Sequence, residues 1–341
     1  MSEKTAPRIG EIDALRGLAA LSVVIYHYTS RYDLLYGHTK TIAFYWPDGH
    51  FGVQLFFAIS GFVILMTLDR SRTAMDFLFS RFSRLYPAYW CSILLTTAGV
   101  FLLGAEDLQR TARDIAVNLT MLQGLFFIPD VDGVYWTLLT ELCFYGCMLG
   151  VFLAGQLRRL DLLLVPWIGL SWLWWAFPDL SYRVGLVLVQ AHIPYFALGI
   201  LAYLVHAGRR RLAAVLPVGA FALATLLVVS GPAHFAVGLL VAAVLLAFVR
   251  GRLGWICQPP LLWLGTISYA LYLVHEAIGW SLIRVLEQQG TDPHLAILAA
   301  LLLAFALAAL VTFGVERPAM RWLRRRYRAA RAQPRREPSA A

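Results

Sequence analysis

Charged residues are scarce in this sequence. Asp, Glu, Lys and Arg make up 14% of its 341 residues, whereas they supply roughly a quarter of a typical soluble domain. Hydrophobic residues make up 60%, and the mean hydropathy is +0.66. Apolar runs close to the ~20 residues needed to cross a bilayer recur along the whole chain. The shortage of charge therefore excludes an ordinary soluble domain and predicts an all-α integral membrane protein, a polytopic bundle of helices.

Cysteine is also scarce. The four cysteines, Cys91, Cys143, Cys147 and Cys257, lie in or beside apolar runs, which excludes a disulfide framework. Cys143 and Cys147 are four residues apart and would share one face of a helix, so a metal site is conceivable. Two thiols without further ligands are better explained as packing residues, and we expect no metal. We also expect no cleavable signal peptide, because the first apolar run carries an arginine.

Ten apolar runs are long enough, or nearly so, to be membrane spans. They cover residues 12–30, 51–68, 87–104, 134–154, 162–177, 185–206, 212–229, 234–249, 260–283 and 295–315. With the amino terminus in the cytosol, 23 of the 29 lysines and arginines fall on the inner side and 6 on the outer side. This excess predicts that both termini are cytosolic, and it accounts for the net charge of +9 without nucleic acid.

The same pattern divides the chain into three parts. These are a cytosolic segment, a membrane domain of ten spans and a basic cytosolic tail, at residues 1–11, 12–316 and 317–341. We expect the tail to lie on anionic lipid or to be disordered, because it combines many arginines with Pro, Ser and Ala.

The first apolar run, 12–30, has an arginine and a histidine at its two ends. Arg16 and His27 are eleven residues apart, so on a helix they share one face and lie about 16 Å apart along the axis. Asp13 is on that face too. Ionisable groups inside a span are costly and usually face the protein interior or an aqueous pathway. Arg16 could instead snorkel to the cytosolic surface while His27 caps the outer end, but the pair together favours a functional site.

Two further arginines are predicted to lie at the level of Arg16. Arg81 and Arg84 are three residues apart on one helical face, directly before the third predicted span at 87–104. Inner-side charge that meets lipid headgroups is the alternative interpretation. Three guanidinium groups at one depth repel one another unless an anion joins them, and a polyphosphate suits their geometry. We therefore favour a polyphosphate site at these three arginines.

The fourth predicted span, 134–154, carries a single polar stripe. Thr137, Glu141 and Tyr145 recur every four residues, which puts them on one face of a helix. If the span runs from outside to inside, Glu141 lies about 7 Å below the outer surface, near the depth expected of His27. A carboxyl group at that depth must be paired or protonated. A catalytic role and a structural ion pair, for example with His27, explain it about equally well.

The ninth predicted span, 260–283, has a similar stripe. Ser268, Tyr272 and His275 share one face, and Tyr269 lies beside them. Polar groups buried in the core explain this pattern about as well as a site does. Serine, histidine and glutamate together suggest a hydrolase triad, but no nucleophile elbow or oxyanion motif accompanies them, so we reject that class.

Five segments of the sequence resemble the acyltransferase family 3 membrane proteins, which include bacterial O-acetylases of lipopolysaccharide, exopolysaccharide and peptidoglycan. The most specific is IDALRGLAALSVVIYH, in which ten residues separate Arg16 from His27. GVQLFFAISGFVI, RFSRLYP, YWTLLTELCFY and LGTISYALYLVH follow in the order of the family. The resemblance extends from Ile12 to Pro318, nearly the whole chain.

The resemblance implies transfer of an acyl group, commonly acetyl, from cytosolic acyl-CoA to a hydroxyl group at the outer face of the bacterial inner membrane. The acceptor would be a saccharide or a lipid-linked glycan. In the family the histidine that matches His27 is the expected catalytic base, and the arginine that matches Arg16 is implicated in CoA binding. Arg81 and Arg84 would then hold phosphates, while the pantetheine arm runs through the bundle over about 16–20 Å.

The remaining candidate residues follow from this chemistry. Glu141 would orient the imidazole of His27 or support its charged form, and a tyrosine or serine of the ninth span would bind the oxyanion or position the sugar. Leu142 follows Glu141 where the family often has a second acid, so only Glu141 carries over. Some family members append an esterase-like domain, where this sequence has a basic tail. The candidate substrate-binding residues are Asp13, Trp136, Ser268, Tyr269, Tyr272 and His275.

Several alternatives stay open at this stage. A transporter of a polar solute would also bury ionisable groups, but no internal repeat or pair of matching broken helices is visible. A non-catalytic scaffold for glycan assembly and acylation of a non-saccharide small molecule are further alternatives. The sequence does not choose between acetyl, succinyl and longer acyl groups, or between a monomer and a homodimer.

Overall fold

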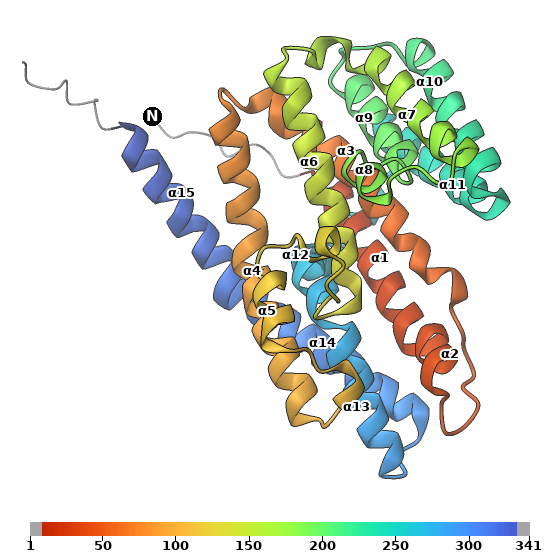
Figure 1. The fold of residues 1–341 in the computed structure, drawn as a ribbon, viewed down its shortest axis with the longest axis vertical. Coiled ribbons are helices and arrows are strands. Elements are labelled where there is room, and N and C mark those ends of the chain that lie inside the picture. The colour runs from red at the N-terminus through yellow and green to blue at the C-terminus, as the bar shows by residue number, and fades with distance from the viewer. Residues whose placement is uncertain (1–8, 333–341) are drawn as a thin grey trace, which may run out of the picture.

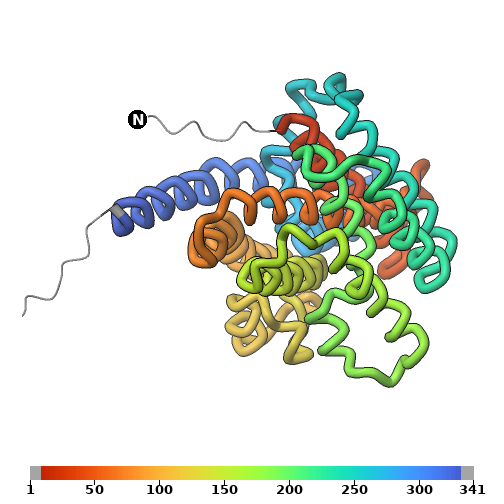
Figure 2. The backbone as a smooth tube through the Cα atoms, turned by 90° about the horizontal axis from the view of Figure 1, so that it is seen from above, coloured from red at the N-terminus to blue at the C-terminus, as the bar shows by residue number. Residues whose placement is uncertain are grey.

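The computed structural model describes residues 9–332, in which helices follow one another and no strand occurs. This confirms the all-α class. At one edge of the molecule α4 and α15 lie side by side, and α7, α10 and α11 gather at the other edge, as Figure 1 and Figure 2 both show. The α-helices are α1 Gly10–Tyr26, α2 Tyr32–Tyr36, α3 Gly52–Arg70, α4 Ala74–Leu102, α5 Ala112–Asn118, α6 Trp136–Leu153, α7 Leu160–Ala176, α8 Tyr182–Val187, α9 Ile193–His206, α10 Leu212–Thr225, α11 Pro232–Val249, α12 Pro259–Val274, α13 Glu276–Gln288, α14 Pro293–Leu310 and α15 Arg317–Ala332.

Six helical segments are long and apolar enough to cross a membrane, and a seventh is added if α12 and α13 count as one bent span. The predicted number of ten is therefore not confirmed. Several of the predicted runs form shorter helices: α1 and α7 have 17 residues each, and α9 has 14. The length and composition of the helices support an integral membrane protein, and the cytosolic placement of the termini stays a prediction. The six segments are Pro47–Arg70, Ala74–Leu102, Gly133–Leu153, Leu212–Ser230, Pro232–Val249 and Pro293–Arg331.

Helix α4 begins earlier than the predicted third span, which starts at residue 87. It runs unbroken from Ala74 to Leu102 with Pro87 inside it. Thr73 caps the first turn: its hydroxyl accepts a hydrogen bond from the backbone N–H of Asp76, whose carboxylate accepts one from the Thr73 N–H. Such a reciprocal cap stabilises the segment before the proline as a helix in its own right. The two arginines of this segment, Arg81 and Arg84, therefore project from a helix of fixed geometry.

The centre of the bundle is built from helices that approach each other through glycines. A Cβ atom added at Gly17 of α1 would lie 2.7 Å from the backbone nitrogen of Gly265 in α12, and one at Gly265 would lie 2.0 Å from the Asp13 carbonyl oxygen. In the second pair, a Cβ atom at Gly199 of α9 would lie 1.7 Å from the Ala58 carbonyl oxygen in α3. Small residues let helix backbones touch in this way.

The predicted ninth span is not a single straight helix. Helices α12 and α13 meet at His275 and are bent by 72°. His275 is fully buried at this break, and the break places its side chain beside the carboxyl-terminal end of α1. A one-residue interruption thus redirects the chain and leaves carbonyl groups of the last turn of α12 without their usual helical partners.

The basic tail is more ordered than predicted. Residues 317–332 form α15, which continues from a π-helical segment, Val311–Glu316, and packs along α4. The Tyr327 ring stacks on Phe79 with 4.2 Å between centroids, and the Tyr327 hydroxyl donates to Asp76. Disorder is therefore the wrong expectation for this part of the tail, whereas 333–341 lie outside the described residues.

Candidate active site

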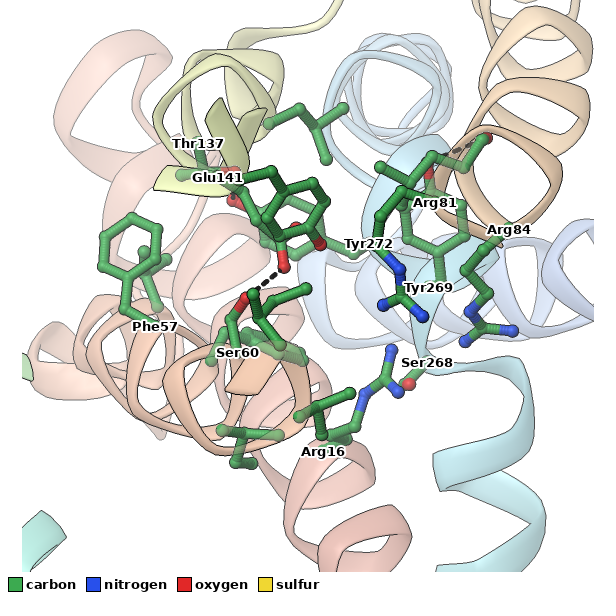
Figure 3. A pocket seen from close by; sticks show the side chains of 18 residues that line it. Arg16, Phe57, Ser60, Arg81, Arg84, Thr137, Glu141, Ser268, Tyr269 and Tyr272 are labelled. Carbon is green, nitrogen blue, oxygen red and sulfur yellow. Dashed lines mark hydrogen bonds between the residues drawn. The ribbon is translucent and has the colours of Figure 1, made fainter. Parts of the chain in front are cut away.

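One elongated cavity runs through the centre of the bundle, and Figure 3 shows the side chains that line it. The space between protein atoms in this cavity, its open mouth included, is about 940 Å³. Along α3 its lining extends from Val53 to Ile64, which corresponds to about 16 Å of helix. The cavity therefore has the length to hold an extended molecule along the bundle axis. Its polar lining residues are Arg16, Ser60, Arg81, Arg84, Thr137, Glu141, Tyr145, Ser268, Tyr269 and Tyr272.

Three arginines gather at one end of this cavity. Arg16 projects from α1, whereas Arg81 and Arg84 project from α4, and their guanidinium groups face the same space in Figure 3. The structure thus brings together the three arginines that the sequence placed at one level. Arg84 forms an ion pair with Glu316, which is 1% exposed, and lies 5.8 Å from the centroid of the Tyr269 ring. We refer to Arg16, Arg81 and Arg84 as the arginine end.

The arginine end retains unused hydrogen-bonding capacity. Within the described residues, the buried Nε atom of Arg81 has no hydrogen-bond partner, and neither has one carboxylate oxygen of Glu316. Arg16 is half-buried, and the charges of Arg84, Asp13 and Glu141 act on its guanidinium group. Buried donors without partners are uncommon in native proteins and call for an explanation. An anion bound between the guanidinium groups would supply both the missing acceptors and the missing negative charge.

The polar stripe of α6 faces the cavity as predicted. Glu141 accepts a hydrogen bond from the Ser60 hydroxyl at 2.6 Å, and Thr137 shares one with the Tyr272 hydroxyl at 2.9 Å. The expected pairing of Glu141 with His27 is not present, however. Glu141 belongs to the same cavity as Arg16, and His27 is not among the residues that line it. Helical periodicity correctly predicted that Thr137, Glu141 and Tyr145 share one face of α6. It did not predict that Glu141 on this face contacts Ser60 of α3.

His27 lies just beyond the opposite end of the cavity, where α1 passes into a π-helical turn, His27–Arg31. Its Nδ1 atom is 3.0 Å from the Nε2 atom of His275, and its Nε2 atom is 3.7 Å from a carboxylate oxygen of Glu276. The indole of Trp280 donates to the His27 carbonyl at 2.8 Å. Tyr272, which lines the cavity, has its ring centroid 5.8 Å from that of His275. We refer to His27, His275 and Glu276 as the histidine end.

The hydrogen bonds of His275 assign the tautomers of both histidines. Its Nδ1 atom is 2.9 Å from the Tyr272 carbonyl oxygen and 3.2 Å from that of Leu271. Because a carbonyl group only accepts, this Nδ1 carries the hydrogen and the Nε2 of neutral His275 is an acceptor. His27 must then donate from Nδ1. Its Nε2 atom is left with a free lone pair beside Glu276, which is the form that a general base requires.

Glu276 is the acid of this site, and it was not among the predicted residues. It is 7% exposed and is packed against Gly133, where an added Cβ atom would lie 2.5 Å from its carboxylate. Asp132, in the loop before α6, lies close enough to interact electrostatically with it. Burial raises the pKa of Asp132 to about 7, and its carboxylate accepts from the Ala277 N–H. The only signal in the sequence was the acid directly after His275 in LVHE.

The other predicted residues occupy different places. Ser268 and Tyr269 line the cavity, but their hydroxyl groups donate to the carbonyls of Gly265 and Leu85. Trp136 is 43% exposed, does not line the cavity and packs beside His192. Asp13 contributes its backbone to the crossing of α1 and α12 and its charge to the surroundings of Arg16. Tyr272 is thus the predicted substrate-binding residue that joins the cavity to the histidine end.

The comparisons with known proteins agree with the resemblance seen in the sequence. A family model described as an acyltransferase domain matches residues 9–313. Nodulation protein 10 of Rhizobium leguminosarum bv. viciae is 34% identical over 112 residues, 28% of this chain and 30% of that protein. A putative peptidoglycan O-acetyltransferase, YrhL of Bacillus subtilis, is 32% identical over 124 residues, 34% of this chain and 17% of that protein.

A third relative is named for exopolysaccharide production. ExoZ of Rhizobium meliloti is 32% identical over 127 residues, which cover 33% of this chain and 36% of ExoZ. The matched segments therefore span well under two thirds of the length of these three relatives. No solved structure matches the chain.

Proposed function

Because the chain belongs to the acyltransferase 3 family of membrane proteins, we propose that it transfers an acyl group from acyl-CoA to a hydroxyl group of a cell-surface or exported saccharide. The acyl group proposed first is acetyl, since relatives carry the names O-acetyltransferase and acetyltransferase. The names of relatives also refer to peptidoglycan and exopolysaccharide, which supports a glycan acceptor. We place the protein in the bacterial inner membrane with both termini in the cytosol, on the basis of its charge distribution.

The observation that carries the proposal is the cavity with cationic groups at one end and a histidine just beyond the other. Acyl-CoA has the matching form, with phosphates at one end and the thioester at the other. Arg16, Arg81 and Arg84 are suited to bind the phosphate groups of CoA, because guanidinium forks match phosphate oxygens. The apolar and hydroxyl-bearing lining between the two ends would then surround the pantetheine arm.

In the proposed reaction, the Nε2 lone pair of His27 takes the proton of the acceptor hydroxyl as its oxygen attacks the thioester carbonyl carbon. The new C–O bond forms, the C–S bond breaks with its electron pair going to sulfur, and His27 passes the proton to the leaving CoA thiolate. His27 can become doubly protonated without moving, because its Nδ1 continues to donate to His275. Glu276, at 3.7 Å from Nε2, stabilises the imidazolium. The Tyr272 hydroxyl lines the cavity and is the proposed donor to the oxyanion.

Glu141 receives a different role from the one that the sequence suggested. It lies in the cavity with Arg16 and is held by Ser60. We propose that it offsets part of the charge of the arginine end while no donor is bound. We therefore propose that His275 is the residue that orients His27, and that Glu276 is the acid beside it.

The test is an assay of the purified protein in detergent with labelled acetyl-CoA and a panel of saccharide acceptors. Release of CoA that depends on the acceptor, with label in the saccharide, is the expected result. His27→Ala should lower the rate by at least about 10²-fold, the usual contribution of general base catalysis, while the protein still elutes as a single species. A variant that keeps most of the wild-type rate removes His27 from the mechanism.

The same preparation in liposomes separates the enzyme from a transporter. Uptake of a polar solute without acyl-CoA would contradict the proposed function, as would CoA release that no acceptor stimulates. Mass spectrometry of surface glycans from a strain that lacks the gene identifies the acyl group and the acceptor together, because the lost mass gives the group and its position gives the acceptor.

A further inference from the structure

Helix α15 lies outside the region that matches the acyltransferase family, which ends at residue 313. It nevertheless packs along the amino-terminal half of α4, the helix that carries Arg81 and Arg84. Figure 1 shows the two helices side by side. Three contacts fix this arrangement, namely the stacking of Tyr327 on Phe79, the Tyr327 hydroxyl bond to Asp76 and the ion pair of Arg331 with Asp76. The position of α15 beside the arginine end is therefore set by specific side chains.

This packing turns one arginine of α15 toward the arginine end. Arg324 lies three residues before Tyr327, on the same face of the helix, and it is partly buried. The charges that act on it most strongly are those of Arg81, Arg84 and Arg328, and all of them are positive. Arg325, the next residue, is exposed. Arg324 is therefore an arginine of α15 whose strongest charged neighbours include two arginines of α4, Arg81 and Arg84.

The charges around Arg324 do not balance within the described residues. Arg84 has Glu316 as its partner, but the Nε atom of Arg81 is buried without a hydrogen-bond acceptor. Holding several guanidinium groups together in a low-dielectric environment is unfavourable unless an anion lies between them. A phosphate group is the anion that guanidinium forks match best. The cluster therefore has the features of a binding site for a phosphate that comes from outside the chain.

We propose that Arg324, together with Arg81, binds the 3′-phosphate of the CoA nucleotide, which is a subsite separate from the diphosphate contacts of Arg16 and Arg84. This inference rests on the proposed function. A donor whose thioester points to the histidine end leaves its nucleotide at the arginine end, and the 3′-phosphate is the phosphate group farthest from the thioester. Helix α15 flanks that end. The tail helix would then select donors that carry the ribose phosphate.

The experiment compares acetyl-CoA with acetyl-3′-dephospho-CoA, which lacks only this phosphate. Wild-type protein in detergent should have a KM for the dephosphorylated donor that is about tenfold higher, as expected for the loss of a charge-assisted contact. Arg324→Ala should raise the KM for acetyl-CoA to that same level, leave the KM for the dephosphorylated donor within about twofold and leave kcat unchanged. Arg324→Lys keeps the charge and should recover part of the preference.

Arg325→Ala is the matched control, because it removes the same charge from an exposed position of the same helix. It should leave both KM values unchanged. If the wild-type protein does not distinguish the two donors, or if Arg324→Ala weakens both equally, the subsite assignment is wrong even though acyl transfer persists. The phosphate group bound by Arg324 could also come from a lipid headgroup, and the experiment distinguishes the two sources. In that case Arg324→Ala would lower the anionic lipid that copurifies, without changing the preference between donors, and the assignment would again be wrong.

Equilibrium binding of CoA and 3′-dephospho-CoA, measured by calorimetry without any acceptor, separates the two proposals. A wild-type preference for CoA that Arg324→Ala abolishes supports the subsite even if no saccharide is acylated. Acyl transfer without such a preference supports the proposed function and overturns the subsite.

Discussion

The Nδ1 atom of His27 and the Nε2 atom of His275 lie 3.0 Å apart, and the hydrogen bond between them has one direction while His275 is neutral. That direction is set by backbone carbonyls at the break between α12 and α13, which hold the hydrogen of His275 on Nδ1. His275 therefore orients His27 as a carboxylate does in other histidine-dependent enzymes, but without adding a negative charge. The free Nε2 of His27 follows from this arrangement.

His275 is thus predicted to be a positioning residue. His275→Ala should lower kcat by roughly 10²-fold, since an imidazole that has lost its orienting partner spends little time in the productive tautomer. The KM for acetyl-CoA should stay within about twofold of the wild-type value, because His275 belongs to the histidine end and not to the arginine end that is proposed to bind the phosphates. His275→Gln places an amide oxygen near the position of Nε2 and should recover part of kcat. Equal loss in the Ala and Gln variants, at unchanged stability, would show that the hydrogen bond is not what matters.

Arg16→Ala should mainly weaken donor binding. The Kd for CoA should rise about tenfold or more, the size expected when a charged hydrogen bond to phosphate is lost. Because Arg16 lies beside Arg84, its removal also lowers the repulsion within the empty site. Calorimetric titration with CoA gives the Kd, and Arg250→Ala, at an exposed position, is the control. Unchanged affinity in Arg16→Ala would remove this residue from the phosphate site.

Asp132 predicts a pH dependence of stability. Burial raises its pKa in the folded protein to about 7, whereas an unfolded aspartate titrates near 4. The folded state therefore binds the proton more tightly, so the stability from this group is complete below about pH 4 and is lost as the pH rises through about 7. Asp132→Asn should reduce the fall in unfolding temperature between pH 5 and pH 8, measured by thermal unfolding in detergent. Asp179→Asn, at an exposed loop position, should leave the fall as it is in the wild-type protein. An unchanged slope in Asp132→Asn would assign the titration to another group.

The crossing of α1 and α12 should tolerate no side chain at Gly265. An added methyl group would lie 2.0 Å from the Asp13 carbonyl oxygen, and such overpacking typically costs about 1–3 kcal/mol. Gly265→Ala should therefore lower the unfolding temperature and the yield of monodisperse protein. Gly150→Ala is the matched control, since an added Cβ atom there meets nothing within 4 Å. Equal stability of the two variants would mean that the helices can separate at little cost.

The sequence predicted what depends on helical periodicity. Arg16, Arg81 and Arg84 line one cavity, and each lies on a helix that the apolar runs and their spacing predict. The stripe of Thr137, Glu141 and Tyr145 faces the cavity for the same reason. Periodicity assigns a residue to a face and a depth, and it succeeds where those two quantities decide the outcome.

Other features depend on how the helices rotate against one another and where they break. Glu141 accepts a hydrogen bond from Ser60, and the acid beside His27 is Glu276. Glu276 follows a 72° bend within an apolar run, and no proline or glycine marks the bend in LYLVHEA. The predicted number of ten spans is not confirmed, because hydropathy alone does not show where a run is interrupted.

The glycine-to-glycine crossing gives the protein a fixed internal length. α1 carries Arg16 and His27, and α12 carries Tyr272, so two helices that touch backbone to backbone cannot slide past each other without moving both ends of the cavity together. A thioester that is too short, such as S-acetylcysteamine, would reach His27 or the guanidinium groups but not both at once. The fixed distance between the two ends therefore selects donors by length and disfavours the binding of small thioesters before any chemical step.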